Sequence, residues 1–181
     1  ENRMAVTQLL AGEELIDVAQ IREEGGADHL LENNPPLGLL LLVSSLCNDA
    51  ILEPNVDSVD DKQPVGDPTE TALISAAAEA GLVKQDLEKW LPRVAELPFD
   101  SDRKRMTTVH EIHQSPADHL ELFSAIADAL QEIAGQEDAV VLTKGAVDQL
   151  LEVSDRRWTN AGIQPLNAAG RERILESNNE L

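Results

Sequence analysis

Apolar residues occur along this chain in short strand-like groups and longer helix-like groups, without a regular strand-helix-strand rhythm. Residues 4–18 have patchy apolar positions broken by Gly12, which predicts a hairpin or two short strands. Further β-branched and apolar groups predict strands at 94–99, 105–112 and 139–143. This mixture predicts an α+β fold in which an antiparallel β-sheet is flanked by helices.

Helices are predicted where apolar periodicity coincides with capping residues. A buried helix follows Pro35-Pro36 and ends near Asn48-Asp49, and Asp67 caps a second helix that stops at Gly81. Shorter helical patterns lie at 84–90, 147–153 and 167–181. The stretch 52–65 contains two prolines and several aspartates, and it is predicted to be a loop.

A separate amphipathic helix is predicted within residues 115–136. Ser115 is its expected cap and Pro116 its first residue. Its apolar positions recur at helical spacing: Leu120, Phe123, Ile126, Leu130 and Ile133. The apolar stripe of this helix can pack on the domain or bind another molecule.

Length and charge limit the possible functions. At 181 residues, one domain spanning 1–181 with a single main core is the default expectation. Acidic residues outnumber basic ones by 34 to 14, giving a net charge of -20, which disfavours nucleic acid and anionic membrane surfaces as partners. A local cationic cluster such as 103–105 can still attract a small polyphosphate, because charges act within about 8 to 10 Å in salt.

The apolar run that begins at Leu37 extends only to Cys47, shorter than the roughly 20 residues that a membrane-spanning helix needs. No direct membrane contact is therefore expected. Cys47 is the single cysteine, and its apolar neighbours predict a buried, reduced thiol. The opening residues have no signal-like pattern and the chain ends within a helical pattern, so we expect it to be part of a longer protein.

Aromatic residues make up only 2% of the chain, which draws attention to Phe99 between Pro98 and Asp100. A flat nucleobase stacks on such a ring, although ordinary core packing is the alternative. The following cations, Arg103, Lys104 and Arg105, are placed on a strand by the pattern, with the two arginines on one face and the lysine on the other. They bind phosphate or form a solvated face.

Two further motifs carry candidate chemistry. Glu70 lies three residues after Asp67, a spacing typical of a capping box, and its carboxylate is also a suitable acceptor for an exocyclic amine. Lys144 offers a cationic donor at the end of a predicted strand, and Gly145 allows a ligand to approach the backbone closely.

Three motifs occur in a fixed order: Asp67-Pro68-Thr69-Glu70, then Pro98-Phe99-Asp100-Ser101-Asp102-Arg103-Lys104-Arg105-Met106, then Lys144-Gly145-Ala146. Together they resemble the nucleotide-binding (N) domain of P-type cation-transporting ATPases, and the absence of a His-Pro dipeptide favours the calcium-type pumps over the heavy-metal pumps. Leu46-Cys47-Asn48-Asp49-Ala50 looks like this family's buried helix. Residues 1–4 are similar to the segment that comes after the family's phosphorylation loop Asp-Lys-Thr-Gly-Thr, a loop that is absent here.

The resemblance implies that Phe99 stacks on adenine, Glu70 contacts the adenine edge and Lys104 lies beside the nucleotide. It also implies that Lys144 and Gly145 line the bottom of the pocket. The full set of expected ATP-binding residues is Glu70, Phe99, Ser101, Lys104, Met106, Thr143, Lys144, Gly145 and Ala146.

Three departures from the family pattern limit the resemblance. Residues 115–136 look like a helical insertion relative to the family, and the other two departures affect the set of expected residues. Ser101 occupies a position that is often a phosphate-contacting arginine, so Arg103 or Arg105 is expected to substitute for it. Val147 follows Ala146 where the family often has proline, which is expected to change only the start of the next helix.

For the parent protein, the resemblance implies an ATP-driven cation pump of which this chain is a cytoplasmic domain. The domain would present the γ-phosphate of ATP, with Mg²⁺ in the full-length enzyme, to an aspartate on a separate phosphorylation domain; the phosphorylation and actuator domains are its expected partners. No nucleophile and base pair is found in this chain, so the isolated domain is expected to bind ATP without hydrolysing it.

Two other interpretations remain open from the sequence. The first is an acidic protein-interaction module that uses the helix at 115–135. The second is a metal site at His110, His113 and His119, although this spacing does not by itself make a tetrahedral set, and no metal ligands are assigned.

Overall fold

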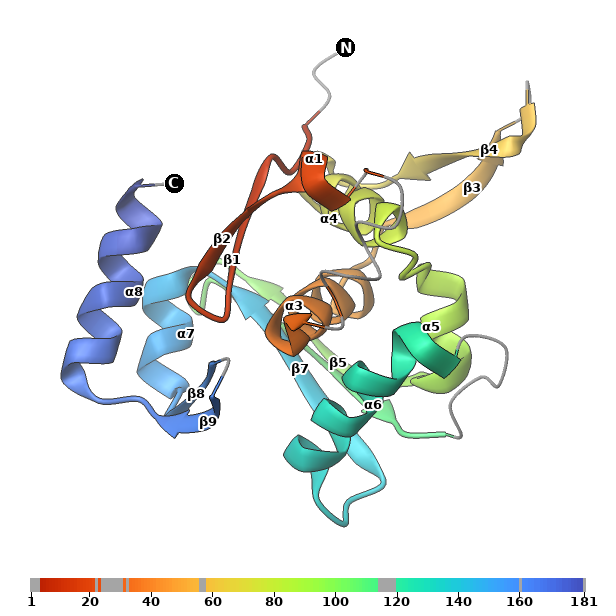
Figure 1. Ribbon diagram of the computed structural model, residues 1–181. Helices are drawn as coiled ribbons and strands as arrows, with labels where there is room; N and C mark the ends of the chain where they lie inside the picture. The colour runs from red at the N-terminus through yellow and green to blue at the C-terminus, as the bar shows by residue number, and fades with distance from the viewer. Residues whose placement is uncertain are drawn as a thin grey trace.

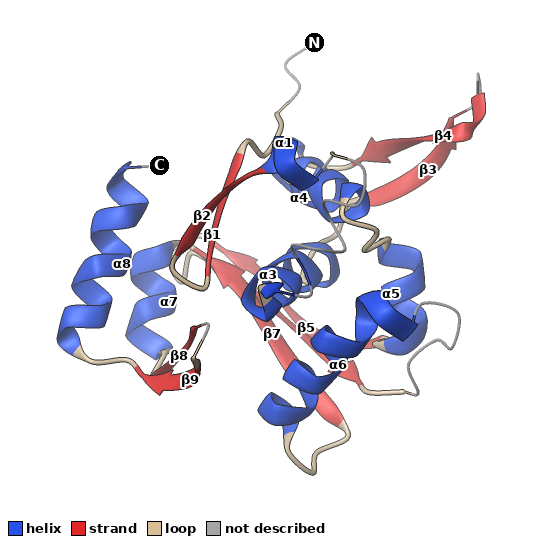
Figure 2. Cartoon of the chain, in the orientation of Figure 1, coloured by secondary structure: helices blue, strands red, loops and turns tan. Residues whose placement is uncertain are grey.

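The computed structural model describes residues 4–21, 23, 31, 33–55, 58–113, 120–159 and 161–180. Helices and strands are interspersed along the chain, as Figure 2 shows. Every described strand pair is antiparallel. The α+β prediction is therefore confirmed.

The described strands form one three-stranded sheet and several hairpins. In chain order they are β1 (Gln8–Ala11), β2 (Glu14–Asp17), β3 (Ile51–Asn55), β4 (Ser58–Val65), β5 (Arg93–Asp100), β6 (Arg105–Glu111), β7 (Ala139–Gly145), β8 (Arg156–Thr159) and β9 (Gly162–Pro165). The three-stranded sheet has the order β5-β6-β7, and its strands correspond to those predicted at 94–99, 105–112 and 139–143. The hairpin predicted within residues 4–18 is β1-β2.

Apart from α1 (Val18–Ile21), for which no helix was predicted, the described helices follow the pattern of the sequence. They are α1 (Val18–Ile21), α3 (Pro35–Leu46), α4 (Pro68–Glu79), α5 (Lys84–Trp90), α6 (Leu120–Ala134), α7 (Val147–Val153) and α8 (Ala168–Glu180). The helices predicted at 84–90 and 147–153 have the observed bounds. Ser115 and Pro116, the expected start of the amphipathic helix, lie outside the described residues.

Helix α3 lies at the centre of the fold and packs against α4, α5, α6, β1 and β7 (Figure 1). Its apolar residues surround the helix, as expected for a helix that is buried on most sides. The N-cap residue Asn34 accepts a hydrogen bond from the N–H of Leu37 at 3.1 Å. The Asn34 amide also donates to the carbonyl of Ala11 at 3.3 Å, so the cap joins the helix to the first hairpin.

Helix α6 packs closely on α3 through its apolar stripe. Ile126 is fully buried and Leu130 nearly so, whereas Ile133 is 48% exposed. A Cβ on Gly38 of α3 would lie 2.7 Å from Cγ1 of Ile126, so only glycine allows the two helices to approach this closely. The described part of the amphipathic helix therefore uses most of its apolar face for the domain's own core.

The prediction of a loop at 52–65 was wrong, because β3 and β4 pair as a hairpin from Ile51↔Val65 inward. The proline at position 64 opposes Leu52 in this pairing. A two-stranded hairpin has two outer edges that need no backbone donors, which is why it accommodates proline. The β8-β9 hairpin occupies a stretch for which the pattern predicted no element.

Two smaller expectations can be compared with the structure. Cys47 is fully buried, as predicted, and its thiol lies 3.5 Å from the carbonyl oxygen of Met106. Within the described residues, no helix has the length and apolar character required to cross a bilayer.

His110 on β6 is fully buried and both of its ring nitrogens have protein partners. Its Nδ1 lies 2.7 Å from the carbonyl oxygen of Leu91 and must donate to it, so Nε2 accepts from the hydroxyl of Thr108 at 2.9 Å. Burial lowers the pKa of His110 below its ordinary value of 6.5, although the hydrogen bond to Leu91 opposes this effect. The imidazole is therefore a neutral structural group.

We expect His110 to make the folded state less stable at acidic pH. Below pH 6.5 the unfolded chain takes up a proton on this residue more readily than the folded chain does, so the free energy of unfolding falls as pH drops from 6.5 towards the lower folded pKa. Urea unfolding at a series of pH values measures this slope. His110→Gln should flatten it and His113→Gln, at an exposed position, should not; equal slopes in wild type and His110→Gln would contradict the assignment.

Candidate functional site

A pocket of about 760 Å³ collects residues from four segments that are far apart in the sequence. Its lining residues are Asp49, Asp67, Thr69, Glu70, Leu73, Phe99, Lys104, Lys144, Gly145 and Ala146. The segments are the loop after α3, the start of α4, the β5-β6 turn and the end of β7. A volume of this size fits one small-molecule ligand.

Phe99 offers an exposed aromatic wall to this pocket. Its side chain is 64% exposed, which is unusual for a large apolar residue and excludes the core-packing alternative. The β5-β6 register shifts between Leu97 and Asp100, and such a bulge redirects the side chains within it. The local backbone therefore places the ring at the pocket.

The turn after Phe99 is held by its own polar groups. The carboxylate of Asp100 accepts hydrogen bonds from the N–H groups of Arg103 and Asp102, each at 2.9 Å, and these bonds lower the pKa of Asp100. The guanidinium of Arg103 donates to the carbonyl of Pro98 at 2.9 Å. Arg103 thus braces the turn, and neither it nor Arg105 is among the lining residues.

Lys104 reaches the pocket because of the turn and not because of strand alternation. Residues 101–104 form the turn and β6 begins only at Arg105, so the prediction that Lys104 and the two arginines occupy opposite faces of one strand was wrong. Lys104 has a φ of 48°, a left-handed conformation that is uncommon for a non-glycine residue. Its carbonyl accepts a hydrogen bond from the N–H of Ala146 at 3.0 Å, which ties the turn to the end of β7.

Gly145 makes this junction possible. It pairs with Arg105, and a Cβ at its position would lie 2.5 Å from the carbonyl oxygen of Lys104 and 2.8 Å from Cα of Arg105. The glycine is therefore required for close approach of two backbones. The expectation from the sequence was that Gly145 lets a ligand approach the backbone. Gly145 also lines the pocket, so it is placed where a ligand could do so.

Glu70 and Lys144 form an ion pair in the pocket wall. Their side chains are 19% and 21% exposed, so the pair is partly shielded from water. The second carboxylate oxygen of Glu70 accepts from the N–H of Asp49 at 3.1 Å. Asp67 caps α4 by accepting from the N–H groups of Thr69 and Glu70, at 2.9 and 3.4 Å, as the sequence predicted.

Three of the predicted site residues lie away from the pocket lining. Met106 is 1% exposed and belongs to the main core, next to the thiol of Cys47. The hydroxyl of Thr143 lies 3.0 Å from that of Thr107 on the neighbouring strand. Ser101 is exposed in the turn after β5. Their role as neighbours of a ligand stays a prediction.

Four lining residues were not among the predicted site residues: Asp49, Asp67, Thr69 and Leu73. Asp67 and Thr69 belong to the motif Asp67-Pro68-Thr69-Glu70, from which only Glu70 was predicted to contact a ligand. Asp49 was assigned to the end of a buried helix, whereas α3 ends at Leu46 and Asp49 is exposed in the following loop. The polar pair Asn48-Asp49 directly after an apolar run was the available signal.

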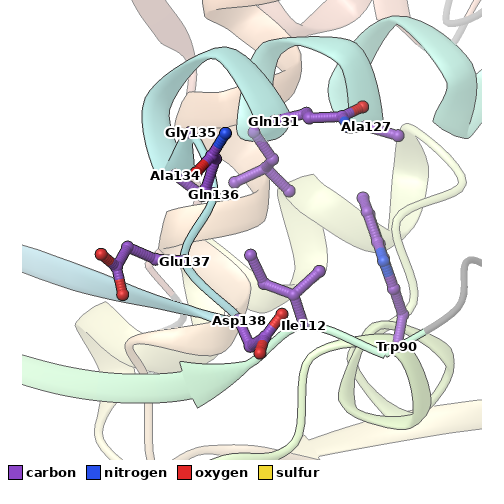
Figure 3. A pocket seen from close by; sticks show the side chains of 10 residues that line it. Trp90, Ile112, Ala127, Gln131, Ala134, Gly135, Gln136, Glu137 and Asp138 are labelled. Atoms are coloured by element: carbon purple, nitrogen blue, oxygen red, sulfur yellow. The ribbon is translucent and has the colours of Figure 1, made fainter.

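A second hollow of about 430 Å³ lies between α6, the end of β6 and the end of α5. Figure 3 shows Trp90 on one side of it and Glu137 on the other, with Ile112 between them. It shares no lining residue with the first pocket. Neither lysine nor arginine occurs among its described lining residues, so they offer an anionic ligand no cationic partner.

The alternative of a histidine metal site finds no geometric support in the described residues. His110 is engaged by Leu91 and Thr108, and His113 is exposed with its Nε2 3.4 Å from a carboxylate oxygen of Glu111. His119 lies outside the described residues. No group of three potential metal ligands occurs in the part of the chain that is described.

Residues 37–181 match a family model described as P-type ATPase, cytoplasmic domain N. Calcium-transporting ATPase 1 of Bacillus cereus is 36% identical over 150 residues, which cover 83% of this chain and 14% of that protein. The calcium-transporting ATPase of Bacillus subtilis is 29% identical over 164 residues, covering 86% of this chain and 16% of that protein. The sodium/potassium-transporting ATPase subunit alpha-2 of Gallus gallus is 26% identical over 97% of this chain and 17% of its own length. The chain thus spans about one sixth of these relatives.

We expect Gly145→Ala to destabilise the domain and to open the junction between the β5-β6 turn and β7. The added methyl overlaps backbone atoms that cannot move independently, and overpacking of this kind costs roughly 1 to 3 kcal/mol. Thermal unfolding measures the loss. Gly162→Ala separates overlap from backbone strain. A Cβ there meets no atom within 4 Å, so any loss of stability in that variant comes from the positive φ of 89° alone. A neutral Gly145→Ala would contradict the close-approach argument.

Proposed function

Because the chain belongs to the P-type ATPases as their cytoplasmic domain N, we propose that it binds ATP in the pocket of Phe99, Glu70 and Lys144, with adenine stacked on Phe99. The observation that carries this proposal is the exposed ring of Phe99 at the same pocket as a partly buried ion pair. An aromatic wall supplies stacking to a base, and the Glu70 carboxylate with the Lys144 ammonium supplies an acceptor and a donor for its edge.

The two lysines of the pocket have different electrostatic roles in this proposal. Lys144 is already neutralised by Glu70, so it offers a directional donor and little net positive field. Lys104 has no ion-pair partner within 4.0 Å among the described residues and is exposed at the same pocket, although its charge also acts on the carboxylate of Asp148. In a chain with a net charge of -20, this ammonium is the local feature that attracts phosphates. The base therefore lies near Lys144 and the phosphates extend past Lys104.

We expect the affinity of this domain for ATP to be weak, with a Kd on the order of 0.1 to 1 mM. One stacking contact and a few hydrogen bonds at an open rim supply only about 4 to 5.5 kcal/mol net. Magnesium should change this affinity little, because recognition goes through the base. A comparison of ATP titrations with and without the ion checks this expectation.

For the parent protein, we propose a calcium-type cation pump in which this domain presents the γ-phosphate of ATP to an aspartate on a separate phosphorylation domain. Movement of the domains relative to one another would supply the approach, and Mg²⁺ would accompany the phosphates in the full-length enzyme. The described pocket contains no nucleophile and base pair for hydrolysis. This domain would therefore bind ATP and depend on partner domains of the parent chain, phosphorylation and actuator domains among them, for turnover.

Removal of the Phe99 ring tests the proposed stack. Phe99→Ala should weaken ATP binding by roughly 1 to 3 kcal/mol, or about 5- to 150-fold, because base-aromatic stacking is worth about that much. Isothermal titration calorimetry measures the change. Leu97→Ala is a matched control, since Leu97 is a large apolar residue on the same strand, 57% exposed, that does not line the pocket.

Both side chains are mostly exposed, so neither variant should lose much folding stability. Unchanged ATP affinity in Phe99→Ala, or equal losses in the two variants, would contradict an adenine stack.

The role of Lys104 is expected to depend on salt. Lys104→Ala should reduce ATP affinity several-fold at about 10 mM salt and by about 2-fold or less at about 0.15 M salt, because an exposed charge is screened over roughly 8 Å there. The loss in Phe99→Ala should be nearly independent of salt and larger than that of Lys104→Ala at about 0.15 M. Titrations of both variants at two salt concentrations make the comparison; a salt-independent Lys104 effect would argue against a role in attracting phosphates.

A further inference from the structure

Asp49 forms part of the pocket wall, although its residue type and position did not predict a role there. Its carboxylate is 60% exposed, and one oxygen, Oδ1, accepts from Nη1 of Arg93 at 2.8 Å. Its main-chain N–H donates to Oε2 of Glu70 at 3.1 Å. The hydrogen bond from Arg93 to Oδ1 therefore orients the side chain. The other carboxylate oxygen has no protein partner among the described residues.

Arg93 holds this part of the wall in place from outside the pocket. Its Nη1 bridges Asp49 and Glu96, both at 2.8 Å, and its Nη2 donates to the carbonyls of Leu46 and Asn48 at 2.9 and 2.6 Å. Although burial disfavours the charged form, the hydrogen bonds with Asp49 and Glu96 raise the pKa of Arg93. One guanidinium thereby fixes both the end of α3 and the carboxylate that follows it.

A second cation, the ammonium of Lys84, also holds the loop after α3. Lys84 is 5% exposed, and its ammonium donates to the carbonyls of Asn48 and Ala50 at 2.5 and 2.9 Å. The Asn48 side chain bridges to the carbonyls of Ser44 and Glu70, at 2.9 and 3.0 Å. The loop from α3 to β3 is therefore anchored on both sides, and Asp49 is its exposed residue at the pocket.

We propose that Asp49 is a specificity-determining residue, held by Arg93 as a positioning residue, that accepts a hydrogen bond from the 6-amino group of a purine. This inference rests on the proposed function, since it requires a base stacked on Phe99. The 6-amino group has two N–H donors, whereas Glu70 already accepts from Lys144 and from the N–H of Asp49. The second carboxylate oxygen of Asp49 provides the further acceptor.

The same geometry disfavours a purine with a 6-oxo group. An oxo oxygen would face a carboxylate that cannot donate, so the two acceptors repel each other and no hydrogen bond forms between them. A site built to hydrogen-bond one group discriminates strongly against an analogue that lacks it. Because the pocket is open, we expect a preference for ATP over inosine triphosphate of about 10-fold.

Asp49→Asn tests the proposal by replacing a hydrogen-bond acceptor of the pocket wall with a donor. In this variant the amide oxygen can still accept the hydrogen bond from Arg93. The amide N–H₂ group, which is a donor, then points towards the ligand. The ratio of ATP to inosine triphosphate affinity, measured by calorimetry, should fall from about 10 to about 1 or below. Loss of one negative charge strengthens both triphosphates alike, so it cancels in the ratio. Asp102→Asn, an equal charge change at an exposed residue outside the pocket, should leave the ratio unchanged.

Arg93→Gln should also lower the ratio, through loss of ATP affinity with that of inosine triphosphate nearly unchanged. Thermal unfolding run in parallel shows whether the variant is folded; if it is not, Asp49→Asn alone decides. An unchanged ratio in Asp49→Asn overturns the inference, and so does an Asp49→Asn effect on 2′-deoxy-ATP relative to ATP, which would assign Asp49 to the ribose. Failure of the proposed function is distinct, because it would appear as absent ATP binding in the wild type or as no effect of Phe99→Ala.

Discussion

The Glu70 carboxylate is the point on which the geometry of the pocket depends. One oxygen pairs with Lys144 at the end of β7, and the other accepts from the N–H of Asp49 after α3. Glu70 itself is positioned by the Asp67 cap at the start of α4. Three segments that are distant in the sequence therefore meet at one partly buried charge, and the fourth segment of the pocket, the β5-β6 turn, is joined to β7 through Lys104 and Ala146.

This arrangement separates the groups that stabilise the domain from those that are available to a ligand. Lys84 and Arg93 hold the loop after α3 from behind, and His110 joins the sheet to Leu91 with both of its nitrogens satisfied. The groups left at the pocket are an exposed ring, the Lys104 ammonium and a partly bonded carboxylate. Phe99 at 64% exposure contributes little to the core, and a bulge and a hydrogen-bonded turn set the position of its ring at the pocket.

Much of the fold could be predicted from local signals. The Asp67 cap, the bounds of α5 and the strands of the main sheet followed from capping residues and β-branched runs. The β3-β4 hairpin could not, because prolines and aspartates normally indicate loops, and the pairing depends on edges that tolerate proline. The turn at 101–104 was also missed, since its shape comes from the Asp100 side chain and a left-handed Lys104 and not from alternation.

The site was predictable where a motif contained the whole interaction and less so where the interaction spans the fold. Phe99, Glu70 and Lys144 stood out because of their residue types and order. Asp49 did not, since the position of its carboxylate depends on Arg93, which lies 44 positions later. Met106 shared a motif with Phe99, yet β6 directs its side chain into the core. Sequence proximity therefore indicated the right segment but not which side chains line the pocket.

The most direct test of the account is an ATP titration of the ¹⁵N-labelled domain followed by backbone NMR. The account predicts that chemical-shift changes cluster at Glu70, Phe99, Lys104 and Lys144, around one pocket. Changes confined to Trp90, Ile112 and α6, around the second hollow of Figure 3, or no changes at ATP concentrations up to several millimolar, would contradict it.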